Sequence, residues 1–114
     1  MVCDTWQVVV VPFPFTDRAA TKRRPAVALS RKRFSSHGHT VLAMITSAVH
    51  APWPGDTRLA DLASAGLRKP CLVRLKIFTL DNRLIERQIG HLARADRTSV
   101  SAALAAHLAG TSSR

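Results

Sequence analysis

The chain is short, apolar enough to fold, and strongly basic. Its 114 residues fit a single domain, 1–114, and exclude a second one of ordinary size. Hydrophobic residues make up 46% of the sequence, which excludes a disordered tail. Lys and Arg number 17 against 7 Asp and Glu, for a net charge of +10. This excess favours a polyanionic partner, first of all nucleic acid, with an anionic membrane surface or an acidic protein as alternatives.

Cysteine spacing and hydropathy bear on the compartment. Cys3 and Cys71 show no repeat spacing, so we expect neither a disulfide framework nor a zinc site. No His, Cys or Asp cluster has the spacing of metal ligands. The apolar run 8–11 is too short to span a bilayer, and no signal peptide precedes it. We therefore expect a reduced, cytoplasmic protein that does not enter a membrane.

The first half of the chain predicts strands. Four consecutive valines suit a buried strand, which Pro12 and Pro14 then end. Pro25 biases Arg24 toward an extended backbone. In chain order we predict a strand over 6–12, a loop over 13–24, a strand over 26–30, a turn or exposed loop over 31–39 and a strand over 40–46.

The second half predicts short strands and a helix. Val73, Leu75 and Ile77 alternate with Arg74 and Lys76, which indicates a half-buried strand with a basic outer face. In chain order we predict a loop over 52–55, a short edge strand over 57–59, one helical turn over 61–65 stopped by Gly66, strands over 72–77 and 83–92, and a helix over 97–109.

The predicted helix completes the fold class. Asp96 is its expected N-cap, Val100, Leu104 and Leu108 form its apolar stripe, and Gly110 stops it. Several short strands followed by one terminal helix predict a mainly β (α+β) fold. We expect a small closed or half-closed barrel with the helix packed on it.

Cations concentrate in one segment. Seven of the 17 basic residues fall between positions 18 and 33. Arginine suits phosphate because its planar fork donates two parallel hydrogen bonds. For Arg18, Lys22 and residues 31–33, direct RNA contact and a merely solvated loop both remain open. For Arg24, held between the loop and a buried strand, we favour a functional role.

Other side chains offer further chemistry. Thr46 and Ser47 end a strand, where a hydroxyl either binds a phosphate oxygen or caps the backbone. His37 and His39 share a basic loop, and such a pair can run ribonuclease chemistry near neutral pH or be ordinary loop residues. Phe15 flanks the basic loop and either stacks on bases or belongs to the core.

Six short segments form an ordered set across the chain. They are VPFPFTD at 11–17, KRRPAV at 22–27, AMITS at 43–47, GLRKP at 66–70, FTLD at 78–81 and LIERQIG at 84–90. Together they resemble the MazF/PemK family of toxins over roughly residues 8–110. The resemblance implies an SH3-like β-barrel with a C-terminal helix, shared in shape with the CcdB toxins, and usually a homodimer.

The resemblance also implies an activity and its partners. Members of the family are sequence-specific endoribonucleases of type II toxin–antitoxin systems that cut single-stranded RNA without a metal or other cofactor. A cognate antitoxin inhibits them with a tail that covers the RNA groove. Trp53, in a loop between two prolines, is a candidate for the subunit interface or the antitoxin contact.

The family's functional residues carry over to matching positions. Its catalytic arginine, directly before the proline, falls on Arg24, and its catalytic threonine falls on Thr46. The implied chemistry is attack by the 2′-OH on the adjacent phosphorus, which leaves a 2′,3′-cyclic phosphate and a 5′-OH. The residues expected to bind RNA are Arg18, Lys22, Arg23, Ser47, Phe15, Arg74 and Lys76.

Two rival functions stay open, one because the fold is shared with the CcdB toxins and the other because of a departure from the family pattern. The family opens its first strand with Gly-Asp, whereas this chain has Trp6-Gln7. The first rival is a non-catalytic toxin that poisons DNA gyrase, as the CcdB toxins do. The second is a nucleic-acid-binding barrel whose catalytic residues have decayed.

Overall fold

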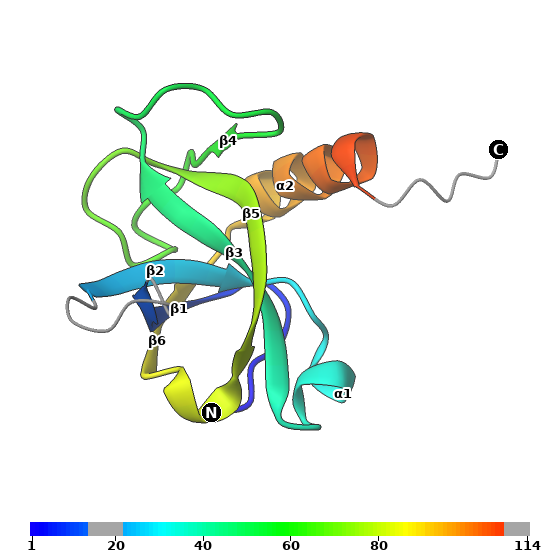
Figure 1. Ribbon diagram of the computed structural model, residues 1–114. Helices are drawn as coiled ribbons and strands as arrows, with labels where there is room; N and C mark the ends of the chain where they lie inside the picture. Colours follow the sequence, from blue (N-terminus) through cyan, green and yellow to red (C-terminus); the bar gives the residue numbers. More distant parts are fainter. Residues whose placement is uncertain (14–21, 109–114) are drawn as a thin grey trace, which may run out of the picture.

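A single curled antiparallel sheet and one long helix make up the described part of the chain. The computed structural model describes residues 1–13 and 22–108. Within these residues six strands pair in the order β4-β5-β3-β2-β1-β6 (Figure 1). In chain order the elements are β1 Gln7–Phe13, β2 Lys22–Ala28, α1 Lys32–Ser35, β3 His39–Ser47, β4 Thr57–Arg58, β5 Cys71–Asp81, the 3₁₀ turn η1 Asn82–Leu84, β6 Arg87–His91 and α2 Arg94–His107. The predicted mainly β fold with a C-terminal helix is confirmed.

The sheet curls into a half-barrel. Phe13 of β1 and Phe78 of β5 lie with their ring centroids 6.0 Å apart, although β2 and β3 separate the two strands. In a flat sheet three strand spacings amount to about 14 Å. The rings therefore meet across the concave side, which we call the inner face, and β4 and β6 remain as the two edges.

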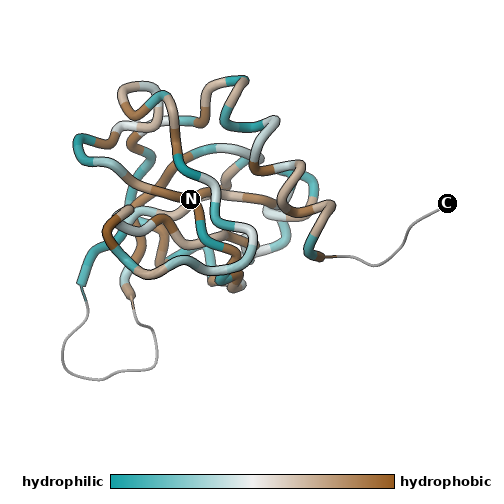
Figure 2. Tube along the Cα trace, turned by 90° about the horizontal axis from the view of Figure 1, so that it is seen from above, coloured by the Kyte–Doolittle hydropathy of each residue, from teal (hydrophilic) through white to brown (hydrophobic). Residues whose placement is uncertain are grey.

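Both faces of the central strands carry a core. The inner cluster consists of Cys3, Val9, Val11, Ala26, Ala28, Leu42, Leu80 and Ile85. The outer cluster consists of Val8, Val27, Ala43, Ile45, Leu59, Ala65, Val73, Leu92 and Val100. Since successive side chains of a strand point to opposite faces, Val8 belongs to the outer cluster and Val9 and Val11 belong to the inner one. Figure 2 shows hydrophobic and hydrophilic stretches following one another along the chain.

The predicted loop over 13–24 is wrong at its C-terminal end. β2 begins at Lys22, so the cations that precede Pro25 belong to a strand. Pro12 also lies within β1, opposite Arg23. β6 pairs with β1 only as far as Val10, so beyond this point β1 has a neighbour on one side and tolerates a proline.

The connection to β3 is partly ordered. The strand predicted over 26–30 ends at Ala28, because the N–H groups of Leu29 and Ser30 both donate to the carbonyl of Val41. The residues predicted as a turn or loop, 31–39, contain the one-turn helix α1, and β3 begins within them.

A bulge interrupts the alternation predicted for β5. The pairs Ala43–Ile77 and Met44–Arg74 are consecutive on β3 but three residues apart on β5. The extra residues bend the strand and break the expected pattern of burial. Val73 is fully buried, whereas Ile77 is 37% exposed.

The strand predicted over 83–92 is wrong in its first half, where η1 stands instead. The Asp81 carboxylate accepts hydrogen bonds from the Arg83 guanidinium, at 3.1 and 2.9 Å, and from the Arg83 N–H at 2.9 Å. The guanidinium, followed by that N–H, lowers the Asp81 pKa to about 2. This local capping turns the chain before β6 begins.

The terminal helix starts earlier than predicted, and its apolar stripe is shorter. Its N-cap is Ala93 and not Asp96. Val100 is buried, but Leu108 follows the helix and is 40% exposed. Gly110 lies outside the described residues. No helix in residues 1–13 and 22–108 is both long and apolar enough to cross a membrane.

Asp96 instead joins the helix to the loop after β4. Its side chain is 2% exposed and accepts the N–H groups of Ala60, at 2.9 Å, and Asp61, at 3.0 Å. The predicted helical turn over 61–65 is an irregular turn. It ends at Gly66, whose φ of +76° favours glycine. A carboxylate at the first turn of α2 therefore fixes this loop against the helix.

We predict that Asp96→Ala lowers the free energy of unfolding by about 3 kcal/mol, because two part-buried N–H groups lose a charged acceptor. Urea unfolding followed by circular dichroism measures the change. Ser99→Ala, on the exposed side of the same helix, is the matched control and should shift stability by less than about 0.5 kcal/mol. Equal stability of the two variants would contradict the structural role assigned to Asp96.

Candidate functional site

Arg24 lies on the inner face near the open end of β2. It pairs with Val11, a member of the inner cluster, and precedes the inner residue Ala26 by two positions. Alternation along the strand therefore places Arg24 on the inner face. Its residue is exposed, and the ladder between β2 and β3 ends before it.

Thr46 occupies the corresponding position on β3. Met44 pairs with the inner residue Ala26, so Thr46, two residues further on, also belongs to the inner face. The ladder between β2 and β3 ends at the Ala26–Met44 pair. Continued by one more step of two residues, its register would set Arg24 opposite Thr46. The two predicted catalytic residues therefore flank the opening where these strands separate.

A cross-strand row extends from Thr46 to the edge of the sheet. Thr46 pairs with Leu72 of β5, and Leu72 pairs with Arg58 of β4. Two strand spacings, about 10 Å, separate Thr46 from Arg58. Arg58 is exposed and brings a cation to the row that sequence patterns did not single out. The only local signal was the short edge strand predicted over 57–59, because the register with β5 arises from long-range pairing.

Arg74 has a structural partner. Its Nε and Nη2 donate to the two carboxylate oxygens of Asp56 at 3.1 and 2.9 Å, and Nη2 also donates to the carbonyl of Ala51 at 2.8 Å. Hydrogen bonding to Asp56 raises the pKa of Arg74, so its charge is permanent. This guanidinium, predicted to bind RNA, holds the loop before β4.

Three other predicted RNA-binding residues have different surroundings. Lys22 pairs with Phe13 and is exposed at the end of β2. Arg23 points to the outer face, where its Nε lies 2.6 Å from a carboxylate oxygen of Glu86. Ser47 pairs with Cys71, which packs on the outer cluster, so alternation places Ser47 on the face opposite Thr46. Arg18 and Phe15 lie outside the described residues.

The candidate histidines are remote from Arg24 and Thr46. His37 and His39 line a hollow of about 200 Å³ together with Phe34. His39 begins β3 and Thr46 stands seven residues along the same strand, roughly 23 Å away. The structure therefore separates the histidine pair from the site built around Arg24. In residues 1–13 and 22–108 no group of three His, Cys, Asp or Glu side chains is placed to hold a metal ion.

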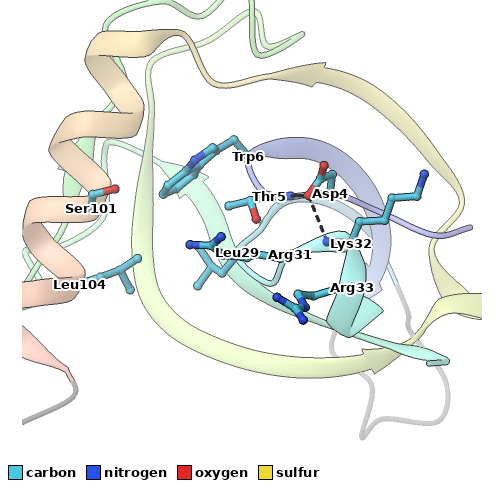
Figure 3. A pocket seen from close by; sticks show the side chains of 9 residues that line it. All are labelled: Asp4, Thr5, Trp6, Leu29, Arg31, Lys32, Arg33, Ser101 and Leu104. Carbon is cyan, nitrogen blue, oxygen red and sulfur yellow. Dashed lines mark hydrogen bonds between the residues drawn. The ribbon is translucent and has the colours of Figure 1, made fainter. Parts of the chain in front are cut away.

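One pocket lies between the sheet and α2. It measures about 740 Å³ (Figure 3). Ser101 and Leu104 of α2 form one wall, and the basic turn at α1 forms another. The lining residues are Asp4, Thr5, Trp6, Leu29, Arg31, Lys32, Arg33, Ser101 and Leu104. Leu29 follows Ala28 of the inner cluster and so continues on the outer side, which separates this pocket from the Arg24–Thr46 opening.

Trp6 lines this pocket and has a backbone conformation that is usually adopted by glycine. Its φ is +76°, a left-handed conformation that costs a non-glycine residue free energy. The Trp6 N–H donates to the carbonyl of Ala28 at 2.8 Å, and the Trp6 carbonyl accepts the N–H of Leu92 at 3.0 Å. The position at which the family has glycine thus has the geometry that glycine favours. Gln7 accepts the Asp4 N–H at 2.9 Å through its side-chain oxygen.

Comparisons with known proteins agree on one family. The family of PemK-like, MazF-like toxins of type II toxin–antitoxin systems matches residues 4–108. No curated protein sequence matches the chain. The Mycobacterium tuberculosis toxin MazF-mt6 superposes with a TM-score of 0.71 at 20% identity, over 88% of this chain and 93% of that one.

Two solved complexes are similar in fold as well. A MazE-MazF structure from Deinococcus radiodurans has a TM-score of 0.73 at 24% identity, over 93% of this chain and 95% of that one. An endoribonuclease in complex with its cognate antitoxin, from a mycobacterial species, has a TM-score of 0.71 at 18% identity, over 92% and 91% of the two chains.

The Arg23–Glu86 pair generates a prediction of small effect. The side chains are 60% and 32% exposed, so solvent screens their attraction. We expect Glu86→Gln to change the free energy of unfolding by less than about 1 kcal/mol in urea titrations. A loss above 2 kcal/mol would show instead that this ion pair is structural.

Proposed function

This chain belongs to the PemK-like, MazF-like toxins of type II toxin–antitoxin systems, and we propose that it is a sequence-specific, metal-independent endoribonuclease that cleaves single-stranded RNA. One observation carries the proposal. Arg24 and Thr46 share the inner face and flank the opening at which β2 and β3 stop pairing. An exposed guanidinium and a hydroxyl at one opening suit the binding of a phosphodiester.

The chemistry follows from these two groups. The 2′-oxygen forms a bond to the adjacent phosphorus as the bond from phosphorus to the 5′-oxygen breaks. The 2′-OH proton is lost, and the leaving 5′-oxygen gains a proton. Negative charge develops on the phosphoryl oxygens, where Arg24 supplies a fixed cationic donor and Thr46 a hydroxyl donor. The products are a 2′,3′-cyclic phosphate and a 5′-OH.

Electrostatics guide RNA to this opening. Lys22 and Arg58 are exposed beside the inner face, and the chain as a whole carries a charge of +10. Such a field accelerates association with a polyanion and makes binding sensitive to salt. We include Arg18 and Phe15 among the proposed RNA contacts on the family resemblance.

The same proposal covers assembly and compartment. The D. radiodurans and mycobacterial relatives were solved with MazE and with a cognate antitoxin, and we propose that an antitoxin covers the RNA groove of this chain. We further propose a homodimer, as the resemblance implies. Cys3 and Cys71 are free thiols, which supports a reducing, cytoplasmic location.

Cleavage of long single-stranded RNA in EDTA tests the activity. We expect discrete cuts by the wild type, with 5′-OH and cyclic-phosphate ends. Thr46→Val should reduce the rate about 10²- to 10³-fold, and Arg24→Ala at least as much, because each loses a donor to the transition state. Arg94→Ala, which removes an exposed arginine from α2, is the charge-matched control and should cut normally.

Other outcomes would redirect the assignment. If Arg24→Ala still cleaves RNA, the catalytic role passes to His37 and His39 as the next candidates. Intact RNA after incubation with folded wild type would contradict the nuclease. A gyrase inhibition assay and a salt titration of RNA binding would then separate the two rival functions.

A further inference from the structure

The loop between β3 and β4 is unusually well anchored for a segment that contains two prolines. Arg74 donates to both carboxylate oxygens of Asp56 and to the carbonyl of Ala51. The side chains of Arg74 and Asp56 are only 12% and 15% exposed. Asp56 also accepts the Trp53 N–H at 2.9 Å. The backbone of Trp53 is thus fixed by a largely buried, bidentate ion pair.

The indole of Trp53 is presented to solvent among cations. Its residue is 39% exposed, although a tryptophan of this size ordinarily gains from burial. The Arg74 guanidinium carbon lies 5.4 Å from the ring centroid, and the Lys76 ammonium lies 5.5 Å from it. Both cations lie over the indole ring, so one nucleotide can bind by stacking its base on the ring surface that they leave open while its phosphate seeks a cation.

The position of the loop links this surface to the proposed nuclease site. Arg74 pairs with Met44, two residues before Thr46 on the inner side of β3. Diagonal neighbours on one face of a sheet lie about 7–8 Å apart. Trp53, whose ring lies against the Arg74 guanidinium, is therefore joined through this one arginine to the inner-face position beside Thr46.

We propose that Trp53 is a specificity-determining residue that stacks on an unpaired RNA base beside the cleaved phosphodiester. Lys76 contacts the phosphate of the same nucleotide, and Arg74 is a positioning residue that acts through the loop. This inference rests on the proposed endoribonuclease function. It assigns Trp53 to RNA, and the sequence-based alternative, a subunit or antitoxin contact, becomes an outcome of the test.

Two substitutions of Trp53 distinguish a stacking role of its ring from the effect of side-chain size alone. Trp53→Leu keeps an apolar side chain but removes the π-face, whereas Trp53→Phe retains an aromatic ring. We expect Trp53→Leu to lower kcat/KM for single-stranded RNA about 10- to 100-fold, mainly through KM, and to blur the preference at one base next to the cut. Trp53→Phe should retain most of the activity. Val49→Ala, in the same loop and 85% exposed, should behave as wild type.

A binding measurement keeps this inference distinct from the proposed function. Fluorescence anisotropy with labelled single-stranded RNA is carried out in the Arg24→Ala background, where the RNA stays intact. We expect weaker binding with Trp53→Leu than with Trp53→Phe whether or not the wild type cleaves. Asp56→Asn, which releases the Arg74 clamp, should weaken binding by an intermediate factor, and restoring aspartate should recover it.

The opposite results would overturn the inference. Equal affinity and unchanged cut sites for Trp53→Leu and wild type would show that the indole does not touch RNA. A change of sedimentation from dimer to monomer with unaltered RNA affinity would assign Trp53 to the subunit interface instead. Uncut RNA from wild type, together with the expected binding difference, would reject the nuclease and retain the RNA contact.

Discussion

The end of the ladder between β2 and β3 is the constraint on which the site depends. At the pairs Ala28–Leu42 and Val27–Ala43, buried apolar side chains lie on both faces of these strands. Beyond the Ala26–Met44 pair β2 and β3 no longer pair, although Val11, opposite Arg24, still belongs to the inner core. A charged Arg24 and a polar Thr46 are tolerated on the inner face because they lie past this point. The end of this ladder therefore determines where polar side chains can lie on the inner face of the sheet.

The basic residues divide according to their solvation. Arg74 is nearly buried and requires the carboxylate of Asp56, since an unpaired charge in that position would be costly. Arg23 is well exposed and meets Glu86 in a screened pair. Arg24 and Arg58 are exposed, and the structure assigns them no ion pair among the described residues. A high net charge thus conceals distinct roles, and burial distinguishes the anchoring cation from those open to an anion.

Several elements were predictable because their causes are local. The valines of β1 predicted a buried strand, and alternation and capping predicted β5 and α2, with errors at the ends. Asp96 shows why the ends failed. A carboxylate before an apolar stripe is typical of an N-cap, but here it bonds the N–H groups of Ala60 and Asp61, some 35 residues earlier in the chain. Tertiary partners of this kind leave no periodic trace in a sequence.

The sequence by itself determined the fold class, the basic character and, through the resemblance, Arg24 and Thr46 as candidates, because hydrophobic period, charge and ordered motifs are properties of the chain alone. Only the tertiary structure decided which groups share a face. It placed Ser47 on the face opposite Thr46, committed Arg74 to the loop, and set Arg58 in the row of Thr46 and the Trp53 ring against Arg74. The physical reason is strand register: a shift of one residue exchanges the faces, and long-range pairing sets that register.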